Sequence, residues 1–314
     1  MPDNVLKETN FTNLGDKKIG KVRDIYLQPD KLIFVSTDRH SSFDRLIAHI
    51  PYKGNVLNRT SAFWFKETED IVPNHVVAIP DPNVTVGKKC EVIPVEVVLR
   101  GFITGTTNTS LWTLYKNGQR DFGNFSLPDG MKKNQKLDEP VVTPTTKSDE
   151  HDRPITPKEI IESEIVNKEL WEQIEDAAMR LFKRGQEVAL AHGLILVDTK
   201  YEFGLDREGK LTLIDEIHTP DSSRYWQAGT FEARLAAGEE PEFFDKEFLR
   251  LWFKEHCDPY NDAVLPEAPA ELIAELSRRY IQIYEQLTGE KFAVDDSTPI
   301  LERIERNLEQ YVIQ

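Results

Sequence analysis

Two stretches near the middle of the chain, "LILVDTKYEFG" and "LTLIDEIHT", constrain the fold more than any other feature. Both are rich in aliphatic and β-branched residues, and the turn-like segment "LDREGK" separates them, so together they predict a β-hairpin. Charged residues occupy every second position of the first stretch, at Asp198, Lys200 and Glu202. Because side chains alternate between the two faces of a strand, these three residues share one face.

The loop of this hairpin decides where a fourth charged residue lies. A loop of two or four residues centred on Glu208 and Gly209 would place Asp215 on the same face, directly opposite Glu202 or one step diagonal to it. Two carboxylates at such a short distance repel one another unless a cation lies between them. Mg²⁺ prefers carboxylate and phosphate oxygens. The hairpin therefore predicts a magnesium site, with Lys200 beside it. The alternative is a solvated strand with exposed ion pairs worth about 0–1 kcal/mol, and spacing alone does not separate the two.

Two further segments carry cations that could bind an anion. In "GKVRDIY", two cations follow a glycine turn, where backbone amides and charge could line a triphosphate; a solvated basic edge strand is the alternative. In "IPVEVVLRGFITGT", Glu96 and Arg100 interrupt an apolar strand. Arg100 could hold a phosphate or carboxylate with two hydrogen bonds, or it could pair internally with Glu96.

Two polar turns add candidate ligands. In "STDRHSSFD", Asp38, Arg39, Ser41 and Ser42 follow a predicted strand and could bind a small acid or cap the following helix. In "TPDSSRYW", Ser223 and Arg224 lie just after the hairpin, where loops commonly carry binding groups. A turn explains the serine through its own hydrogen bonds, but it does not explain Arg224.

The rest of the chain predicts an α+β fold with mainly antiparallel sheets. Residues 14–36 are typical of short strands, "NVLNRTSAFWFKETED" has helical spacing, and the polar stretch 119–156 predicts a functional loop. "TPKE" combines a threonine cap, a proline and a glutamate, and predicts helices running to His192. Periodic segments predict further helices near 243–256, 268–288 and 298–312. We expect two domains, 1–100 and 101–314.

Composition limits the function classes. A formal net charge of −15 and a pI near 5.0 argue against a nucleic-acid-binding surface. Cys90 and Cys257 are too few for a disulfide framework, and no segment approaches the roughly 20 apolar residues that span a bilayer. We expect a soluble cytoplasmic protein with reduced cysteines and no membrane or nucleic-acid partner.

The motifs quoted above, together with "KGNVLNRTSAFWF", resemble in order and spacing the phosphoribosylaminoimidazole-succinocarboxamide synthase (SAICAR synthetase) family across residues 17 to about 290. The Pro-x-Glu-x-x-x-Arg and Asp-x-Lys-x-Glu-x-Gly segments are the most specific. The resemblance implies two α+β domains related to ATP-grasp enzymes, with ATP in the cleft between them. It also implies a carbon–nitrogen ligase that joins L-aspartate to carboxyaminoimidazole ribonucleotide (CAIR) in purine biosynthesis, using ATP and Mg²⁺.

The same resemblance implies roles for individual residues. ATP would be bound by Gly20, Lys21, Val22, Arg23, Glu96 and Val98, and the metal by Glu202 and Asp215. The ribonucleotide would be bound by Asp38, Ser42, Arg100, Thr106, Asp198, Lys200, Ser223 and Arg224. Relatives often have Gly-Ser where this chain has Gly105-Thr106. The role of Thr106 is therefore the one that the resemblance implies least directly.

The expected reaction proceeds through an acyl phosphate that the aspartate amine captures. Lys200 and Asp198 are the candidate catalytic residues, with Asp198 a candidate base. A small-molecule kinase and a non-catalytic nucleotide-binding regulator are the competing functions. The first would release ADP without aspartate, and the second would bind ATP without turnover. We expect a monomer or a small homo-oligomer, which the sequence does not decide.

Overall fold

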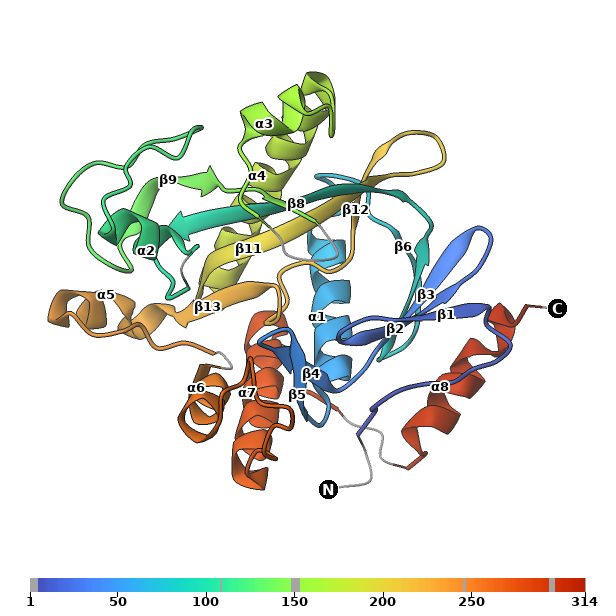
Figure 1. Cartoon of the computed structure of the whole chain (residues 1–314). Coiled ribbons are helices and arrows are strands. Elements are labelled where there is room, and N and C mark those ends of the chain that lie inside the picture. Colours follow the sequence, from blue (N-terminus) through green and yellow to red (C-terminus); the bar gives the residue numbers. More distant parts are fainter. Residues whose placement is uncertain (1–4, 108, 148–152, 245–246, 294–296, 314) are drawn as a thin grey trace. The chain divides into compact units, whose positions relative to one another are not determined.

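The computed structural model describes residues 5–107, 109–147, 153–244, 247–293 and 297–313 (Figure 1). The chain divides into two compact units. Unit 1 comprises Met1–Phe65, His75–Lys89 and Phe244–Gln314, and unit 2 comprises Lys66–Asn74 and Cys90–Phe243. Helices combine with antiparallel sheets in both units, so the predicted α+β class is confirmed.

Unit 1 contains a five-stranded antiparallel sheet in the order β1-β2-β3-β7-β6. Its first three strands form the predicted meander, because short turns join neighbours of alternating burial. A separate two-stranded ribbon follows β3. The bounds of these strands are β1 Asp16–Ile19, β2 Arg23–Leu27, β3 Lys31–Ser36, β4 Arg39–Ser42, β5 Arg45–His49, β6 Val76–Asp81 and β7 Val84–Lys88.

The helices of unit 1 lie in two groups, α1 Lys53–Glu67 with α6 Glu247–His256 and α7 Ala270–Thr288, and α8 Ile300–Leu308 with the 3₁₀ turn Glu309–Tyr311. α1 shares one apolar core with α6 and α7, built around Val56, Phe253 and Tyr280. Ile304 and Leu308 of α8 pack into a second core with the sheet. The three predicted C-terminal helices are therefore confirmed, since each buries the apolar stripe that its periodicity indicates.

Unit 2 is organised around two long, paired strands, β8 Glu91–Phe102 and β11 Leu194–Leu205 (Figure 1). β11 also pairs with β12 Leu211–Ile214 and β13 Ser223–Gln227, while β8 pairs with β9 Lys136–Val142 and β10 Thr145–Thr146. Every pairing is antiparallel, as expected for a sheet built from hairpins.

Four helices complete unit 2: α2 Leu111–Lys116, α3 Pro157–Glu162, α4 Lys168–Ala191 and α5 Ala228–Ala237. The predicted capping box is confirmed, since Thr156 and Glu159 bond each other's backbone N–H groups at the start of α3. α4 ends one residue before His192, and Gly193 follows in the left-handed conformation that favours glycine. α4 packs against β11 and β8.

Three features differ from the prediction. The division at residue 100 is not the observed one, because that position lies inside β8 and the C-terminal helices group with the N-terminal residues in unit 1. The stretch 119–156 is partly ordered into β9 and β10, whose backbone groups pair with β8. The hairpin loop spans residues 206–210, an odd number, so the predicted register is wrong.

Within the described residues, no helix is long and apolar enough to cross a bilayer. Both cysteines are thiols rather than halves of a disulfide.

Candidate active site

The sheet of unit 2 presents one highly charged face, which we call the front face. Asp198, Lys200 and Glu202 of β11 lie opposite Arg100, Val98 and Glu96 of β8, respectively. Since residues paired across a sheet project to the same side, the predicted sharing of one face by the three β11 residues is confirmed. The intervening Thr199, Tyr201 and Phe203 are buried on the rear face.

One end of this face is a carboxylate cluster, formed by Glu96, Glu202, Asp215, Lys200 and Lys147. Nζ of Lys200 lies 2.6 Å from Oε1 of Glu96 and 3.4 Å from Oε1 of Glu202. Lys147, which follows β10, forms an ion pair with the other oxygen of Glu202. A buried carboxylate is thus bridged by two ammonium groups from different parts of the chain.

Asp215 reaches this cluster by an unexpected route. Ile214 is the partner of Glu202, so a regular continuation of β12 would direct Asp215 to the rear face. Instead, β12 ends at Ile214 and Asp215 adopts φ +68°, a left-handed conformation that aspartate tolerates better than most residues. Its charge then interacts with both Glu202 and Lys200. The predicted neighbourhood of Glu202 and Asp215 holds, although the register from which it was derived does not.

The pKa values of the cluster record this crowding. Burial and the neighbouring charge of Asp215 raise the pKa of Glu202, while Lys200 and Lys147 work in the opposite direction. Burial disfavours the charged form of Lys200, but the carboxylates of Glu202, Glu96 and Asp215 outweigh it and raise the pKa of that ammonium. Lys200 is therefore a fixed positive charge at physiological pH. An excess of acidic groups remains around it, which suits a divalent cation.

The other end of the front face is an arginine cluster, formed by Asp198, Arg224, Arg100 and Thr143. The guanidinium of Arg224 donates two hydrogen bonds to the Asp198 carboxylate, one of them from Nε to Oδ1 at 3.0 Å. Nη1 of Arg100 lies 3.6 Å from Oδ2 of the same carboxylate, and its Nε donates to Oγ1 of Thr143 at 2.8 Å. The competing pair of Arg100 with Glu96 does not form, because Asp198 and Lys200 are their partners across the strands.

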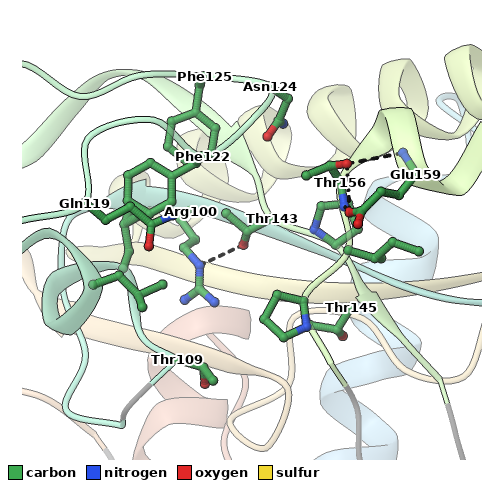
Figure 2. Close-up of a pocket in the computed structure, with 15 residues that line it drawn as sticks. Arg100, Thr109, Gln119, Phe122, Asn124, Phe125, Thr143, Thr145, Thr156 and Glu159 are labelled. Carbon is green, nitrogen blue, oxygen red and sulfur yellow. Dashed lines mark hydrogen bonds between the residues drawn. The ribbon is translucent and has the colours of Figure 1, made fainter.

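Arg100 also projects into a pocket of about 240 Å³ in unit 2 (Figure 2). Burial lowers the pKa of Arg100, and the nearby Arg224 contributes in the same sense, whereas Asp198 opposes both. Thr143 lies beside the guanidinium, and Phe122 and Phe125 form an apolar wall. The two phenyl rings are stacked with centroids 4.8 Å apart. A buried guanidinium with hydroxyls around it can bind a phosphate or carboxylate group.

The structure brings Gly105 close to the arginine cluster but turns Ser223 away. Gly105 has φ +110°, and a Cβ there would lie 2.4 Å from Cβ of Ser110 and 3.6 Å from Nη1 of Arg224. Only glycine fits this close approach. Thr106 follows with an exposed side chain, and its contact with substrate stays a prediction. The hydroxyl of Ser223 instead bonds Thr199 at 2.7 Å, on the rear-face side of β11.

The predicted ATP-binding residues are distributed over both units. Gly20, Lys21 and Val22 form the turn between β1 and β2 in unit 1, and Lys21 makes an exposed ion pair of 2.7 Å with Asp44. Arg23 opens β2 and lies over the ring of Phe34. Other residues of unit 1 support the turn formed by residues 20–22 through its backbone carbonyl groups.

A buried arginine provides this support. Nη2 of Arg39 donates to the carbonyl of Gly20 and to Oδ1 of Asp24, and its Nε donates to the carbonyl of Lys21. Thr37 donates through both its N–H and its hydroxyl to the carbonyl of Val22. These contacts occupy the carbonyl side of the turn.

Glu96 and Val98 lie in unit 2 as interior positions of β8. Lys200 and Thr143 flank Val98, and its carbonyl accepts the N–H of Thr143 at 2.8 Å. Glu96 is committed to Lys200, as described above. An adenine contact from these two residues stays a prediction.

The helix-cap alternative is confirmed for Asp38 but not for Ser42. Asp38 is fully buried, and its two oxygens accept the N–H groups of Gly54 and Leu6, so it caps the start of α1. Burial raises its pKa to about 6 against these hydrogen bonds. Ser42 pairs with Arg45 in the β4–β5 ribbon, so the helix-cap alternative for Ser42 is wrong. Their contact with substrate stays a prediction.

Sequence reasoning overlooked Thr143, Thr145 and Lys147. Thr143 contacts Arg100, Thr145 donates to Glu96 at 3.5 Å, and Lys147 pairs with Glu202. Their spacing at alternate positions is the same period of two that marks β11, and it was the signal available within "TPTTKSD". Residues 148–152, which belong to the predicted functional loop 119–156, lie outside the described residues.

A divalent metal fits the carboxylate cluster. Among the described residues, no group of three or more His, Cys, Asp or Glu side chains is arranged to hold a metal alone. Mg²⁺ does not require one, because it commonly binds through one or two carboxylates together with substrate phosphates and water. The charge of Asp215 raises the pKa of the Glu202 carboxyl, so the two lie near one another, and both supply oxygen ligands of this kind.

Comparison with known proteins agrees with this chemistry. The sequence profile of the SAICAR synthetase family matches residues 17–267. The chain is 56% identical over 308 residues to a phosphoribosylaminoimidazole-succinocarboxamide synthase of Legionella pneumophila (strain Lens), with 98% of each chain covered. It is 53% identical over 312 residues to the chloroplastic enzyme of Arabidopsis thaliana, covering 98% of this chain and 76% of that one.

Solved structures are similar as well. The SAICAR synthase of Saccharomyces cerevisiae, solved in complex with SAICAR, matches with a TM-score of 0.80 and 32% identity, over 92% of this chain and all of that one. A SAICAR synthetase in complex with ADP matches with a TM-score of 0.67 and 27% identity, over 89% of this chain and all of that one. The chain therefore belongs to the SAICAR synthetase family.

Proposed function

We propose that the protein ligates L-aspartate to CAIR, forming SAICAR, ADP and phosphate as a step of purine biosynthesis. The name shared by relatives over nearly the whole chain supports this activity, and the ADP-bound relative supports ATP as the co-substrate. One feature of the site carries the proposal: Lys200 lies on β11 between Glu202 of the carboxylate cluster and Asp198 of the arginine cluster. A metal–phosphate group and an anionic second substrate can thus be bound side by side.

The chemistry requires two displacements. First, an oxygen of the CAIR carboxylate attacks the γ-phosphorus of ATP, the bond to the β-phosphate oxygen breaks, and ADP leaves. Second, the aspartate nitrogen attacks the acyl carbon of the resulting acyl phosphate, phosphate leaves, and the nitrogen loses a proton as the amide forms. Both steps bring anions together, so fixed positive charge is the main contribution the protein can make.

Within this scheme, Glu202 and Asp215 would hold Mg²⁺, which neutralises phosphate charge when bound. Lys200, kept charged by its carboxylate neighbours, faces the same region and stabilises the carboxylate as it approaches the phosphate. Lys147 contributes a second ammonium from the loop after β10. We assign the contacts with the ATP phosphates in unit 1 to the turn at Gly20–Arg23.

The arginine cluster is assigned to the ribonucleotide. The guanidinium groups of Arg224 and Arg100 carry charge of the kind that binds a phosphate, and the hydroxyl of Thr143 contacts Arg100. Asp198 is bound by both arginines, so its part is to orient them, and a role as general base is disfavoured by those contacts. Binding at this end of the face would leave the carboxylate end free for ATP and metal.

The test is a reconstitution from purified components. The full chain is supplied with ATP, Mg²⁺, aspartate and CAIR, and each is omitted in turn, with SAICAR followed by its absorbance and ADP by a coupled assay. SAICAR formation that depends on all four components is the expected result. ADP release without aspartate would indicate a kinase instead, and ATP binding without turnover would indicate a regulator. Glu202→Ala should abolish turnover, whereas Glu208→Ala, in the exposed loop of the same hairpin, should not.

A further inference from the structure

A buried contact lies on the rear face of the sheet, directly behind the carboxylate cluster. The hydroxyl of Tyr201 and Nε2 of His218 are 2.5 Å apart, and the two rings lie 5.4 Å apart at 57°. The hydroxyl of Tyr225, on β13, donates to the backbone carbonyl of His218 at 2.6 Å. His218 has no exposed surface. We call these three residues the rear anchor.

Helix α4 is shaped to accommodate this anchor. A Cβ added at Gly185 would lie 2.4 Å from Cε1 of the His218 ring, a distance that real contacts do not reach. The helix therefore carries glycine in its interior, at a cost to its own stability, where the imidazole packs. Three elements converge on one residue, His218: β11 through Tyr201, β13 through Tyr225 and α4 through Gly185.

The segment held by the anchor is conformationally unusual. Asp215 has φ +68° and His218 has φ +50°, so two residues other than glycine are left-handed within four positions. Such conformations are unfavourable for a free chain and persist where surrounding contacts fix them. Within the segment, Thr219 donates to Glu216 at 2.5 Å and accepts from the N–H of Ser222 at 3.2 Å. His218 also makes contacts that reach from the segment to Tyr201 of β11 and Tyr225 of β13.

The position of Tyr201 links the anchor to the front face. Tyr201 lies between Lys200 and Glu202 in β11, and its side chain points to the opposite face from theirs. The anchor thus ties the backbone that carries Lys200 and Glu202 of the carboxylate cluster to the segment that carries another of its members, Asp215. A shift of His218 would therefore change the direction of the Asp215 side chain even if Asp215 and Glu202 themselves were left unsubstituted.

We propose that His218 is a positioning residue for this reaction: through the rear anchor it holds segment 215–218 in the left-handed turns that direct the Asp215 carboxylate toward Glu202. The inference rests on the proposed function, because it gives the paired carboxylates their role as ligands of a divalent cation. Its chemistry is that of second-sphere support, in which a residue that never contacts the metal fixes the geometry of one that does.

The test measures metal binding rather than turnover alone. Mn²⁺ binding to the full chain with ATP is followed by electron paramagnetic resonance, and the Mg²⁺ dependence of SAICAR formation gives a separate KM and kcat. Tyr201→Phe deletes one oxygen, His218→Gln replaces the imidazole, and Gly185→Ala pushes against it. Each should weaken Mn²⁺ binding about 10- to 100-fold and raise the KM for Mg²⁺, with a changed resonance of the bound ion.

A matched control separates positioning from loss of fold. Tyr115→Phe removes another buried hydroxyl of unit 2, one that donates to the carbonyl of Pro128, and it should leave Mn²⁺ affinity unchanged. If His218→Gln does not fold, Tyr201→Phe decides the matter, since it keeps the ring packing. Wild-type Mn²⁺ affinity in a folded Tyr201→Phe protein would overturn the inference. Unchanged affinity in Glu202→Gln would instead overturn the metal site itself, and with it the need for positioning.

Discussion

The ammonium of Lys200 bridges Glu96 and Glu202, with Nζ at 2.6 Å and 3.4 Å from their oxygens. The two carboxylates come from the neighbouring strands β8 and β11, so the ammonium of Lys200 is held relative to both strands. Each partner restricts the long side chain and keeps it protonated. A flexible lysine is thereby converted into an oriented charge on the front face, which is the form in which it can stabilise a transition state without reorganisation.

Replacing Lys200 with methionine should reduce kcat about 10²- to 10³-fold, the usual effect of removing one preorganised charge from a transition state. Methionine retains much of the side-chain volume, so packing on the strand is preserved. The remaining carboxylates would also repel more strongly and raise the pKa of Glu202 further. Steady-state kinetics with saturating ATP, aspartate and CAIR measure the change.

Lys210→Met is the matched control for Lys200, because Lys210 is exposed in the loop of the same hairpin. It should retain wild-type kcat. A Lys200→Met enzyme within threefold of wild type would remove this lysine from the catalytic machinery.

Arg224→Lys tests the arginine cluster. The planar guanidinium makes two hydrogen bonds to Asp198 and can bind an anion in the same bidentate way, whereas an ammonium offers a single point of charge. Loss of one charge-assisted hydrogen bond costs about 1.5–3 kcal/mol, so the KM for CAIR should rise about 10- to 100-fold. The KM for ATP should change little. Arg180→Lys, on the exposed surface of α4, is the control, and equal rises for CAIR and ATP would contradict the assignment.

The charged face of β11 could be predicted because alternation is a local property of a strand. Asp198, Lys200 and Glu202 needed only the period of two to be placed together. The same reasoning applies to Thr156, whose capping box depends on residues three positions apart. Interactions between residues a few positions apart can therefore be predicted from the sequence alone.

The register of the hairpin could not be predicted, because it depends on the conformation of residues 206–210 rather than on their composition. The left-handed turn at Asp215 likewise has no local signal, since it is held by His218 and the contacts behind the sheet. The assignment of α8 to unit 1 depends on residues 222 positions apart, Asp81 and Arg303. Periodicity predicts that a helix forms, and only tertiary packing determines where it packs.

Arg303→Ala should destabilise unit 1. Its guanidinium forms a buried two-bond pair with Asp81, at 2.9 Å and 3.1 Å, and also donates to Asn83. Removing it leaves the buried Asp81 carboxylate without its counter-charge, which typically costs about 3–5 kcal/mol in the free energy of unfolding. Urea denaturation monitored by circular dichroism measures the loss. Arg306→Ala, exposed on the same helix, should change stability by less than about 0.5 kcal/mol.

His218 also predicts how stability depends on pH. Burial lowers the pKa of this imidazole to about 3, whereas in the unfolded chain it has its ordinary value near 6.5. Between these values the unfolded chain binds a proton that the folded chain excludes, so the free energy of unfolding falls as the pH falls from 6.5 toward 3. At pH 5 the loss from this residue is about 2 kcal/mol relative to pH 7.

A variant without the titrating group isolates this contribution. His218→Gln is less stable than wild type at pH 7, but its free energy of unfolding should decline less steeply, so that the difference between the two proteins shrinks by about 2 kcal/mol between pH 7 and pH 5. Urea denaturation at pH 7, 6 and 5 measures both slopes. His256→Gln, an exposed position on α6, should follow the wild-type slope. Parallel slopes for His218→Gln and wild type would mean that the buried imidazole takes up a proton without leaving its place between Tyr201 and Gly185.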